Sequence, residues 1–153
     1  MFRLPPFFRD LGKRLIKSPK LYFYDTGLLC HLLGVLDADF VKKSDLKGGL
    51  FEDLVVADAF KSFYHQGIRP YFYFYRNQQK KEVDLLYEHA LEIKLWEIKA
   101  TDRFKPRLLD QLEKVAGFWG RPAVTNLVYS GDEEHQLRKS TLINWRSLEW
   151  HQR

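Results

Sequence analysis

The chain has 153 residues, of which 45% are hydrophobic and 16% aromatic, so it can bury one good core but hardly two, and we expect one compact unit. Lys and Arg number 25 against 20 Asp and Glu, a net charge of +5 that permits an anionic partner such as nucleic acid but falls far short of a histone-like excess. The single cysteine, Cys30, excludes a disulfide framework and a cysteine-rich metal cluster, and the lack of an apolar run of ~20 residues or a signal pattern predicts a soluble, cytoplasmic protein with no membrane partner.

The first 37 residues predict an N-terminal arm followed by a helix. Proline, phenylalanine and basic residues are mixed up to Ser18-Pro19, where the proline disfavours helix before it. A short aromatic extended piece follows. A helix is then expected to begin at Asp25 or Thr26, both good N-caps, and to end near Gly34.

A polar stretch over residues 37–49 leads into the main domain, which we expect to cover residues 38–153. Its first element is predicted as a helix over residues 48–67, bounded by glycines and with one apolar face. Two acids interrupt this pattern, because Glu52 lies on the apolar half and Asp53 on its opposite shoulder. A buried carboxylate requires a cation, a metal or a hydrogen-bond donor, so we expect each to have a partner elsewhere in the fold.

The remainder of the chain alternates strand-like and helical segments. Aromatic and β-branched residues predict strands, whereas an apolar stripe in the period of 3.6 residues predicts a helix. The order of the segments predicts an α/β (α+β) fold in which a central mixed β-sheet is flanked by helices. Strands are expected over residues 70–76, 82–89, 91–99 and 123–131, a helix over 106–119, a charged loop over 132–139, and a short last piece over 141–148.

The segment "VDLLYEHALEIKLWEIKA" (83–100) contains two copies of one small pattern, Glu92–Lys94 and Glu97–Lys99, in a strand-like sequence. A tight antiparallel hairpin that turns between Ala90 and Leu91 would pair positions whose numbers sum to 181. This turn lacks Asn-Gly or Asp-Gly chemistry, and a slip of one residue would reverse every face. The register therefore decides which copy can contribute to a site.

In the expected register Asp84 lies opposite Glu97, about 5 Å away at Cβ, and Lys99 projects from the same face. Glu92 and Lys94 project from the other face, so we favour the second copy. Two close carboxylates repel unless a cation lies between them, and such oxygens suit Mg²⁺ or Mn²⁺, which bind through one or two carboxylates and several waters. With Asp84 and Glu97 as metal ligands and Lys99 orienting a water or stabilising phosphate charge, the pattern outlines metal-assisted phosphodiester hydrolysis.

The pattern Asp-x12-Glu-x-Lys, preceded by an acid on a helix, resembles the PD-(D/E)xK nuclease superfamily, also called the restriction-endonuclease-like fold. The resemblance implies catalytic roles for Asp84, Glu97 and Lys99 on a β-hairpin and an auxiliary role for Glu52. Val83 stands where the pattern has its proline, a position at which the superfamily's motif is loose.

A second resemblance covers nearly the whole chain, from about Leu4 to Leu148. The segments "LPPFFRDLGKRLIKSPKLYFYDTGLL", "GGLFEDLVV", "YFYFYRNQQKKEVDLL" and "WEIKA" are similar, in order and spacing, to the domain of unknown function found C-terminal to the P-loop module in many prokaryotic AAA+-type ATPases. This resemblance implies a PD-(D/E)xK-like fold and an ATPase module as a partner in a longer chain. No Gly-x4-Gly-Lys-Ser/Thr loop is present here, so we do not expect ATP hydrolysis by these residues alone.

Three other readings of these residues remain open. The charges could form a structural salt bridge between Lys99 and either Asp84 or Glu97, with Glu52 in the same network. The domain would then be a non-catalytic accessory or interaction module of an ATPase-type protein. It could also bind nucleic acid without cleaving it, or act as a homo-oligomer, as nucleases of this fold that cut duplexes commonly do. Basic residues that could follow a phosphate backbone are Lys80, Lys81, Arg103, Lys105 and Arg107.

Overall fold

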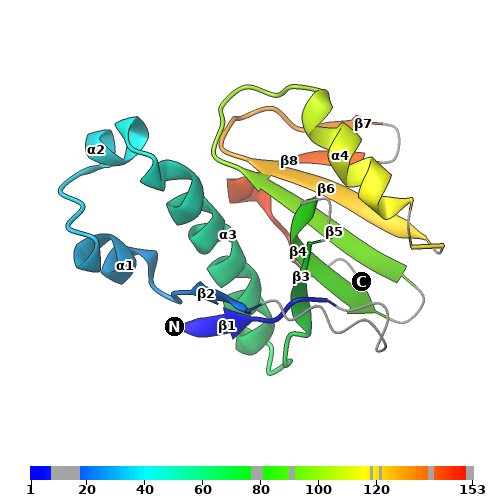
Figure 1. The fold of residues 1–153 in the computed structure, drawn as a ribbon, viewed down its shortest axis with the longest axis horizontal. Coiled ribbons are helices and arrows are strands. Elements are labelled where there is room, and N and C mark those ends of the chain that lie inside the picture. Colours follow the sequence, from blue (N-terminus) through cyan, green and yellow to red (C-terminus); the bar gives the residue numbers. More distant parts are fainter. Residues whose placement is uncertain are drawn as a thin grey trace.

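The computed structural model describes residues 1–7, 18–76, 81–89, 92–117, 119–120, 122–137 and 140–150. Its helices and strands carry the labels of Figure 1. In chain order they are β1 (Phe2–Leu4), β2 (Lys20–Tyr22), α1 (Thr26–Leu32), α2 (Ala38–Lys43), α3 (Leu46–His65), β3 (Phe72–Arg76), β4 (Glu82–His89), β5 (Glu92–Lys99), α4 (Arg107–Ala116), β6 (Ala123–Tyr129), β7 (His135–Leu137), β8 (Ser140–Asn144) and the 3₁₀ turn η1 (Trp145–Ser147).

A mixed sheet forms the centre of the molecule, as the sequence predicted. In the described part of the chain six strands follow the order β3-β4-β5-β6-β8-β7. The pairs β3–β4, β4–β5 and β7–β8 are antiparallel, whereas β5–β6 and β6–β8 are parallel. The expected α/β (α+β) class with helices beside a mixed sheet is therefore confirmed.

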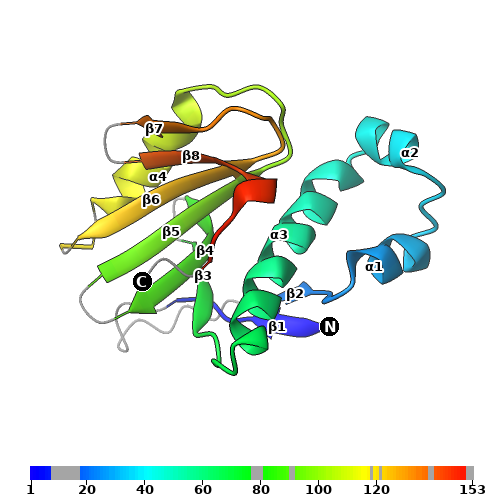
Figure 2. The same cartoon turned by 180° about the vertical axis from the view of Figure 1, so that it is seen from behind.

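Helices α3 and α4 cover opposite faces of this sheet. Successive side chains of a strand point to opposite faces, so the contacts of neighbouring β5 residues show which helix covers each face. Trp96 and Ile98 of β5 pack in a cluster with the apolar face of α3, and Ile93 and Leu95 pack with α4. Helix α4 lies in front of the sheet in Figure 1 and behind it in Figure 2. Both faces of β5 are thus covered, which explains why this strand is apolar on both sides.

Helix α3 begins earlier than the glycine boundary that the sequence indicated. It runs over Leu46–His65, so Gly48 and Gly49 lie in its first turns. Each glycine costs about 1 kcal/mol relative to alanine in a helix. Burial of Leu50 within the same turns contributes about 1.5–3 kcal/mol, which is comparable to the cost of the two glycines together.

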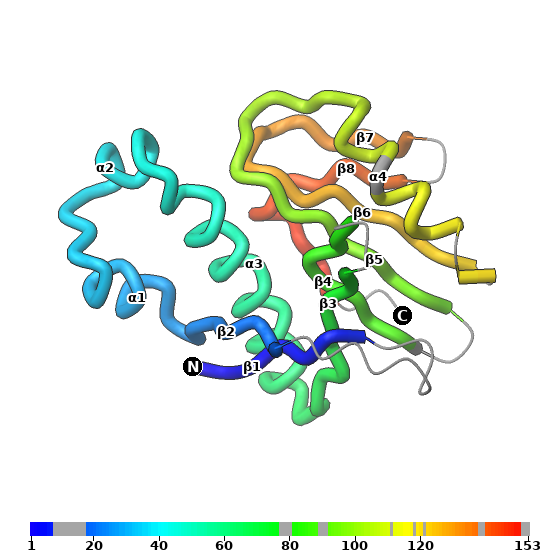
Figure 3. The backbone as a smooth tube through the Cα atoms, viewed as in Figure 1, coloured from blue at the N-terminus to red at the C-terminus, as the bar shows by residue number. Residues whose placement is uncertain are grey.

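The N-terminal segment forms a two-stranded ribbon, β1–β2, that packs on the core. Leu4 of β1 is fully buried and Tyr22 of β2 is nearly so, both in the cluster beneath α3. The chain then leaves the sheet through α1 and α2 and returns along α3, as the tube in Figure 3 shows. Helix α1 begins where expected, with the Asp25 carboxylate accepting the Leu28 N–H at 2.9 Å, and Gly34 follows it with a φ of 69°.

Two predicted loops contain regular structure. The polar stretch over 37–49 includes α2, because the Asp37 carboxylate caps a helix by accepting the Phe40 N–H at 2.7 Å. The charged loop over 132–139 includes β7, which gains its ladder from pairing with β8. Neither segment has the apolar periodicity from which such elements are predicted. None of the helices in the described part of the chain has the length and hydropathy needed to cross a bilayer.

Candidate active site: a cluster of carboxylates and lysines

The β4–β5 hairpin has the predicted register. The pairs run from Leu85–Trp96 to His89–Glu92, and the residue numbers of each pair sum to 181. Asp84 and Glu97 are the next residue on each strand, at the end of the hairpin far from its turn. The predicted turn at Ala90 and Leu91 lies outside the described residues.

A β-bulge in β4 fixes the position of Asp84. The pairing of β3 with β4 shifts by one residue between Tyr73–Leu86 and Tyr75–Val83, so β4 has one residue more than β3 over this interval. Bulges redirect side chains and are frequent beside active sites. Oδ2 of the Asp84 carboxylate accepts a hydrogen bond from the Ile98 N–H at 2.8 Å. The Asp84 side chain is therefore held against the backbone of β5.

Lys99 joins the two buried carboxylates of the hairpin. Its Nζ lies 2.6 Å from Glu97 Oε1 and 3.7 Å from Asp84 Oδ2. Asp84 and Glu97 are only 6% and 7% exposed. Glu92 and Lys94 instead line a separate cavity of about 570 Å³ together with Trp96, on the other face of β5. The second copy of the Glu-Ile-Lys pattern is therefore the one that meets Asp84.

Glu52 reaches the same cluster through a lysine that the sequence reasoning missed. The Lys20 ammonium lies 2.9 Å from Glu52 Oε1, 2.5 Å from Glu82 Oε1 and 3.8 Å from Asp84 Oδ1. The Tyr22 hydroxyl donates to Glu52 at 2.5 Å. Two spacings in the sequence could have indicated these contacts, Lys20-x-Tyr22 and Glu82-x-Asp84, because residues two apart lie on the same face of a strand.

The other helical acid, Asp53, has a structural role. It is 3% exposed, and its carboxylate accepts the Phe23 N–H at 2.7 Å and the Thr26 hydroxyl at 2.8 Å. These bonds attach the segment after β2 to α3. Asp53 therefore holds in place the strand that carries Lys20.

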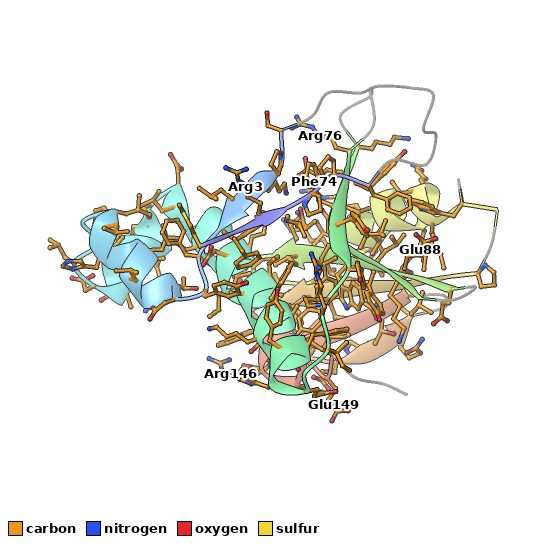
Figure 4. The ribbon with its side chains drawn as sticks, turned by 90° about the horizontal axis from the view of Figure 1, so that it is seen from below. Arg3, Phe74, Arg76, Glu88, Arg146 and Glu149 are labelled. Carbon is orange, nitrogen blue, oxygen red and sulfur yellow. The ribbon has the colours of Figure 1, made fainter. Side chains whose placement is uncertain are left out.

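Aromatic and basic residues of β3 border the cluster. Figure 4 shows Arg3, Phe74 and Arg76 on one side of the molecule, with Arg146 and Glu149 on the opposite side. The Lys20 ammonium lies 5.4 Å from the centroid of the Phe74 ring, within the range of a cation–π interaction. The Arg76 Nε lies 3.5 Å from Glu82 Oε2. A cavity of about 460 Å³ between α1 and α3 opens beside Lys20.

Burial and mutual repulsion make the two hairpin carboxylates difficult to ionise. Burial, and then the neighbouring Asp84 carboxylate, raises the pKa of Glu97 to about 7, although Lys99 opposes this. Burial and the Glu52 carboxylate likewise raise the pKa of Asp84. Burial alone would lower the pKa values of Lys20 and Lys99, but the surrounding carboxylates outweigh it and raise both. The ammonium groups therefore stay charged, and added positive charge would favour ionisation of the acids.

The donor atoms suit one divalent cation held by two carboxylates. Glu97 Oε2 is buried and has no hydrogen-bond partner among the described residues, although Oε1 is paired with Lys99. Asp84 and Glu97 supply the hard oxygen ligands that Mg²⁺ and Mn²⁺ prefer, with water completing the coordination shell. In the described part of the chain no group of three or more His, Cys, Asp and Glu side chains is arranged to hold a metal ion. Among the described residues, Asp84 and Glu97 are the carboxylates that meet at Lys99.

The fold and the cluster define an α+β domain with a charged site at the open end of a β-hairpin. Residues 47–148 match the family described as "Domain of unknown function (DUF4143)", and the chain belongs to this family. Residues 1–39 match a second description, "Domain of unknown function (DUF8612)".

Two curated relatives come from mycobacteria. The uncharacterized protein Rv2008c of Mycobacterium tuberculosis is 34% identical to this chain over 99 residues, and the uncharacterized protein Mb2031c of Mycobacterium bovis matches equally. The match covers 65% of this chain but only 22% of each relative, so the chain spans about a fifth of their length. No solved structure matches the chain.

Proposed function

We propose that this domain is a Mg²⁺- or Mn²⁺-dependent nuclease of the PD-(D/E)xK type that hydrolyses phosphodiester bonds in DNA or RNA. The observation that carries the proposal is the meeting of Asp84, Glu97 and Lys99 at one end of the hairpin, with Glu97 Oε2 buried and unpaired among the described residues. A carboxylate oxygen without a partner is costly to bury, and a cation would remove that cost.

Each residue of the cluster has a separate task in this proposal. Asp84 and Glu97 would hold the ion, which would supply Lewis-acid polarisation of the scissile phosphate. Lys99, whose side chain is 38% exposed, reaches solvent and stabilises negative charge on the phosphate or orients the attacking water. The water oxygen bonds to phosphorus as the bond to the departing sugar oxygen breaks. The water gives a proton to solvent, and the departing oxygen takes one up.

Nucleic acid is the proposed partner because basic residues adjoin, along the chain, the two strands that carry the site. Arg103, Lys105 and Arg107 are exposed on the segment that follows β5, and Lys81, directly before β4, is half-buried. Lys80 lies outside the described residues. Electrostatic contacts of this kind attract a phosphate backbone without selecting a sequence.

We also propose that the domain corresponds to the C-terminal part of an AAA+-type ATPase. The support is the whole-chain resemblance, together with relatives in which the matching segment makes up 22% of the length. A second candidate function, a non-catalytic interaction module of such a protein, is favoured by one specific observation. The α1–α2 region leaves large apolar side chains exposed, namely Leu28 (51%), Leu32 (63%), Leu36 (88%) and Phe40 (46%).

The chain contains its own control for the nuclease test. Lys99→Ala and Lys94→Ala remove the same side chain from the two copies of the Glu-Ile-Lys pattern, on opposite faces of β5. We expect cleavage of single- or double-stranded DNA or RNA in Mg²⁺ or Mn²⁺ to fall at least about 100-fold in Lys99→Ala and to remain within about threefold of wild type in Lys94→Ala.

Isothermal titration with Mn²⁺ separates the two candidate functions. The nuclease binds the ion, and the folded Asp84→Ala/Glu97→Ala variant does not. The proposal fails if the wild-type domain neither binds Mn²⁺ in the presence of an oligonucleotide nor cleaves any of the four substrates. If the wild-type domain does not bind Mn²⁺ and the Asp84→Ala/Glu97→Ala variant differs from it only in a lower free energy of unfolding, the interaction module would be favoured.

A further inference from the structure

The Lys20 ammonium lies among carboxylates from two different elements of the fold. Three carboxylates surround it, from Glu52 on α3 and from Glu82 and Asp84 on β4, at 2.9, 2.5 and 3.8 Å. The ring of Phe74 covers a further side at 5.4 Å. The Lys20 side chain is only 25% exposed, so this ammonium group is an internal part of the site.

The fold delivers Lys20 to this position on a fixed backbone. Tyr22, two residues on, is 4% exposed and donates its hydroxyl to the same Glu52 oxygen that receives Lys20. The following residues are attached to α3 through the bonds of Asp53 to the Phe23 N–H and the Thr26 hydroxyl. Lys20 therefore does not reach the site as a loose surface side chain.

Asp84 lies between two cationic positions. Its Oδ1 faces Lys20, and its Oδ2 faces Lys99 and the Ile98 N–H. Two-metal phosphodiesterases use a comparable arrangement, in which two cations about 3.5–4 Å apart stabilise the attacking and leaving oxygens. On the Lys99 side, the buried Glu97 Oε2 has no hydrogen-bond partner among the described residues, so an oxygen remains for a metal ion. On the other side, the Lys20 ammonium already lies among the carboxylates.

We propose that the Lys20 ammonium is a built-in second cation, so that the domain takes one divalent ion, at Asp84 and Glu97, and excludes another from the position between Glu52, Glu82 and Asp84. The first ion rests on the proposed nuclease function, but the exclusion of the second does not. An ammonium nitrogen sits about 2.8 Å from its oxygens, whereas Mg²⁺ or Mn²⁺ requires about 2.1 Å. The Glu52 and Glu82 carboxylates, at 2.9 and 2.5 Å, are spaced for an ammonium group, whereas Asp84 is farther away at 3.8 Å. All three would have to close in around a metal ion that replaced it.

The test counts Mn²⁺ ions by isothermal titration of three proteins. These are the wild type, Lys20→Met, and the control Lys42→Met, which removes an exposed lysine paired with Asp39 on α2. We expect one ion in the wild type and in Lys42→Met, and two in Lys20→Met. A folded Lys20→Met variant that binds the same number of ions as the wild type overturns the inference, as does a wild type that binds two.

The outcomes distinguish this inference from the proposed function. No ion in the wild type and one in Lys20→Met would support the built-in cation and reject the metal site at Asp84 and Glu97. One ion in both proteins would reject the built-in cation and leave that site intact.

A measurement on the wild-type protein keeps the inference testable if both Lys20→Met and the milder Lys20→Gln fail to fold. Amine acylation of the native protein, read by mass spectrometry, should modify Lys20 at least tenfold less than Lys42. Saturating Mn²⁺ should leave that ratio unchanged. Labelling of Lys20 close to that of Lys42, or a severalfold rise when Mn²⁺ is added, would overturn the inference, because the ammonium group would then be loosely held or displaceable.

Discussion

Two buried carboxylates, those of Asp84 and Glu97, share the Lys99 ammonium at the open end of the β4–β5 hairpin. Each is less than a tenth exposed, and each pKa lies above its ordinary value because burial and the neighbouring acid disfavour the charged form. The site is therefore a place where ionisation itself costs folding free energy. The shared lysine reduces this cost without removing it.

This linkage predicts a stability that falls as the pH rises. The pKa of Glu97 is about 7 in the folded protein and near 4.5 when unfolded, so the native state binds the proton more tightly. The stabilisation is complete below about pH 4.5 and is lost as the pH passes through about 7, at a cost on the order of 2 kcal/mol. Urea unfolding at pH 5 and pH 8 measures the change. Glu97→Gln should reduce this change in the free energy of unfolding, whereas Glu134→Gln, on the exposed loop before β7, should leave it as in the wild type. An equal change in the wild type and in both variants would show that Glu97 is not the residue responsible.

At the scale of elements, the site depends on the docking of β2 against α3. The β4–β5 hairpin supplies Asp84, Glu97 and Lys99. Glu52 of α3 is connected to them through the Lys20 ammonium, which lies close to both the Glu52 and the Asp84 carboxylates. Asp53 accepts the two hydrogen bonds that attach the segment after β2 to α3. One helix therefore provides both an acid of the site and the anchor of its lysine.

Asp53→Ala should loosen this docking. The substitution leaves the Phe23 N–H and the Thr26 hydroxyl without their acceptor, and hydrogen bonds to a charged group contribute about 1.5–3 kcal/mol each. We expect the free energy of unfolding to fall by about 2–4 kcal/mol. Asp39→Ala, at an exposed ion pair on α2, should leave the free energy of unfolding almost unchanged. Similar losses in the two variants, measured by urea unfolding, would show that Asp53 does not anchor the ribbon.

At the scale of the whole molecule, the sheet with its two covering helices contrasts with the α1–α2 region. Figures 1 and 2 show α1 and α2 standing away from the sheet on the far side of α3. In this region Leu32 and Leu36 are 63% and 88% exposed. Such side chains add little to the folding of the domain, because they remain in water.

Leu32→Ser/Leu36→Ser should therefore leave the fold intact while changing the surface. We expect the free energy of unfolding to stay within about 0.5 kcal/mol of wild type, and the binding of an apolar fluorescent dye to the native protein to fall at least twofold. The same substitution at one buried leucine, Leu85→Ser, should lower the free energy of unfolding by about 3 kcal/mol or more. A large loss of stability in the surface variant would mean that this region packs more tightly than its exposure indicates.

Local pattern was sufficient to predict much of the fold and part of the site. The alternation along residues 82–99 gave the correct register, and the Asp25 cap gave the start of α1. Helix α2 and strand β7 were not predicted, because their stability comes from a cap and a partner strand in otherwise polar sequence. The start of α3 was also misplaced, since burial of Leu50 overrides the preference of Gly48 and Gly49 for a helix boundary.

The sequence by itself determined that Asp84, Glu97 and Lys99 can meet, because a hairpin is local and its side chains repeat every two residues. Only the tertiary structure decided that Lys20 and Glu52, which are 32 residues apart in the sequence, form an ion pair. That contact requires the N-terminal ribbon to be docked on α3 by Leu4, Tyr22 and Asp53. Packing between distant segments has no period along the chain, and so the sequence, which placed Glu52 beside Asp84 only through a resemblance, did not show that Lys20 and Glu82 join them.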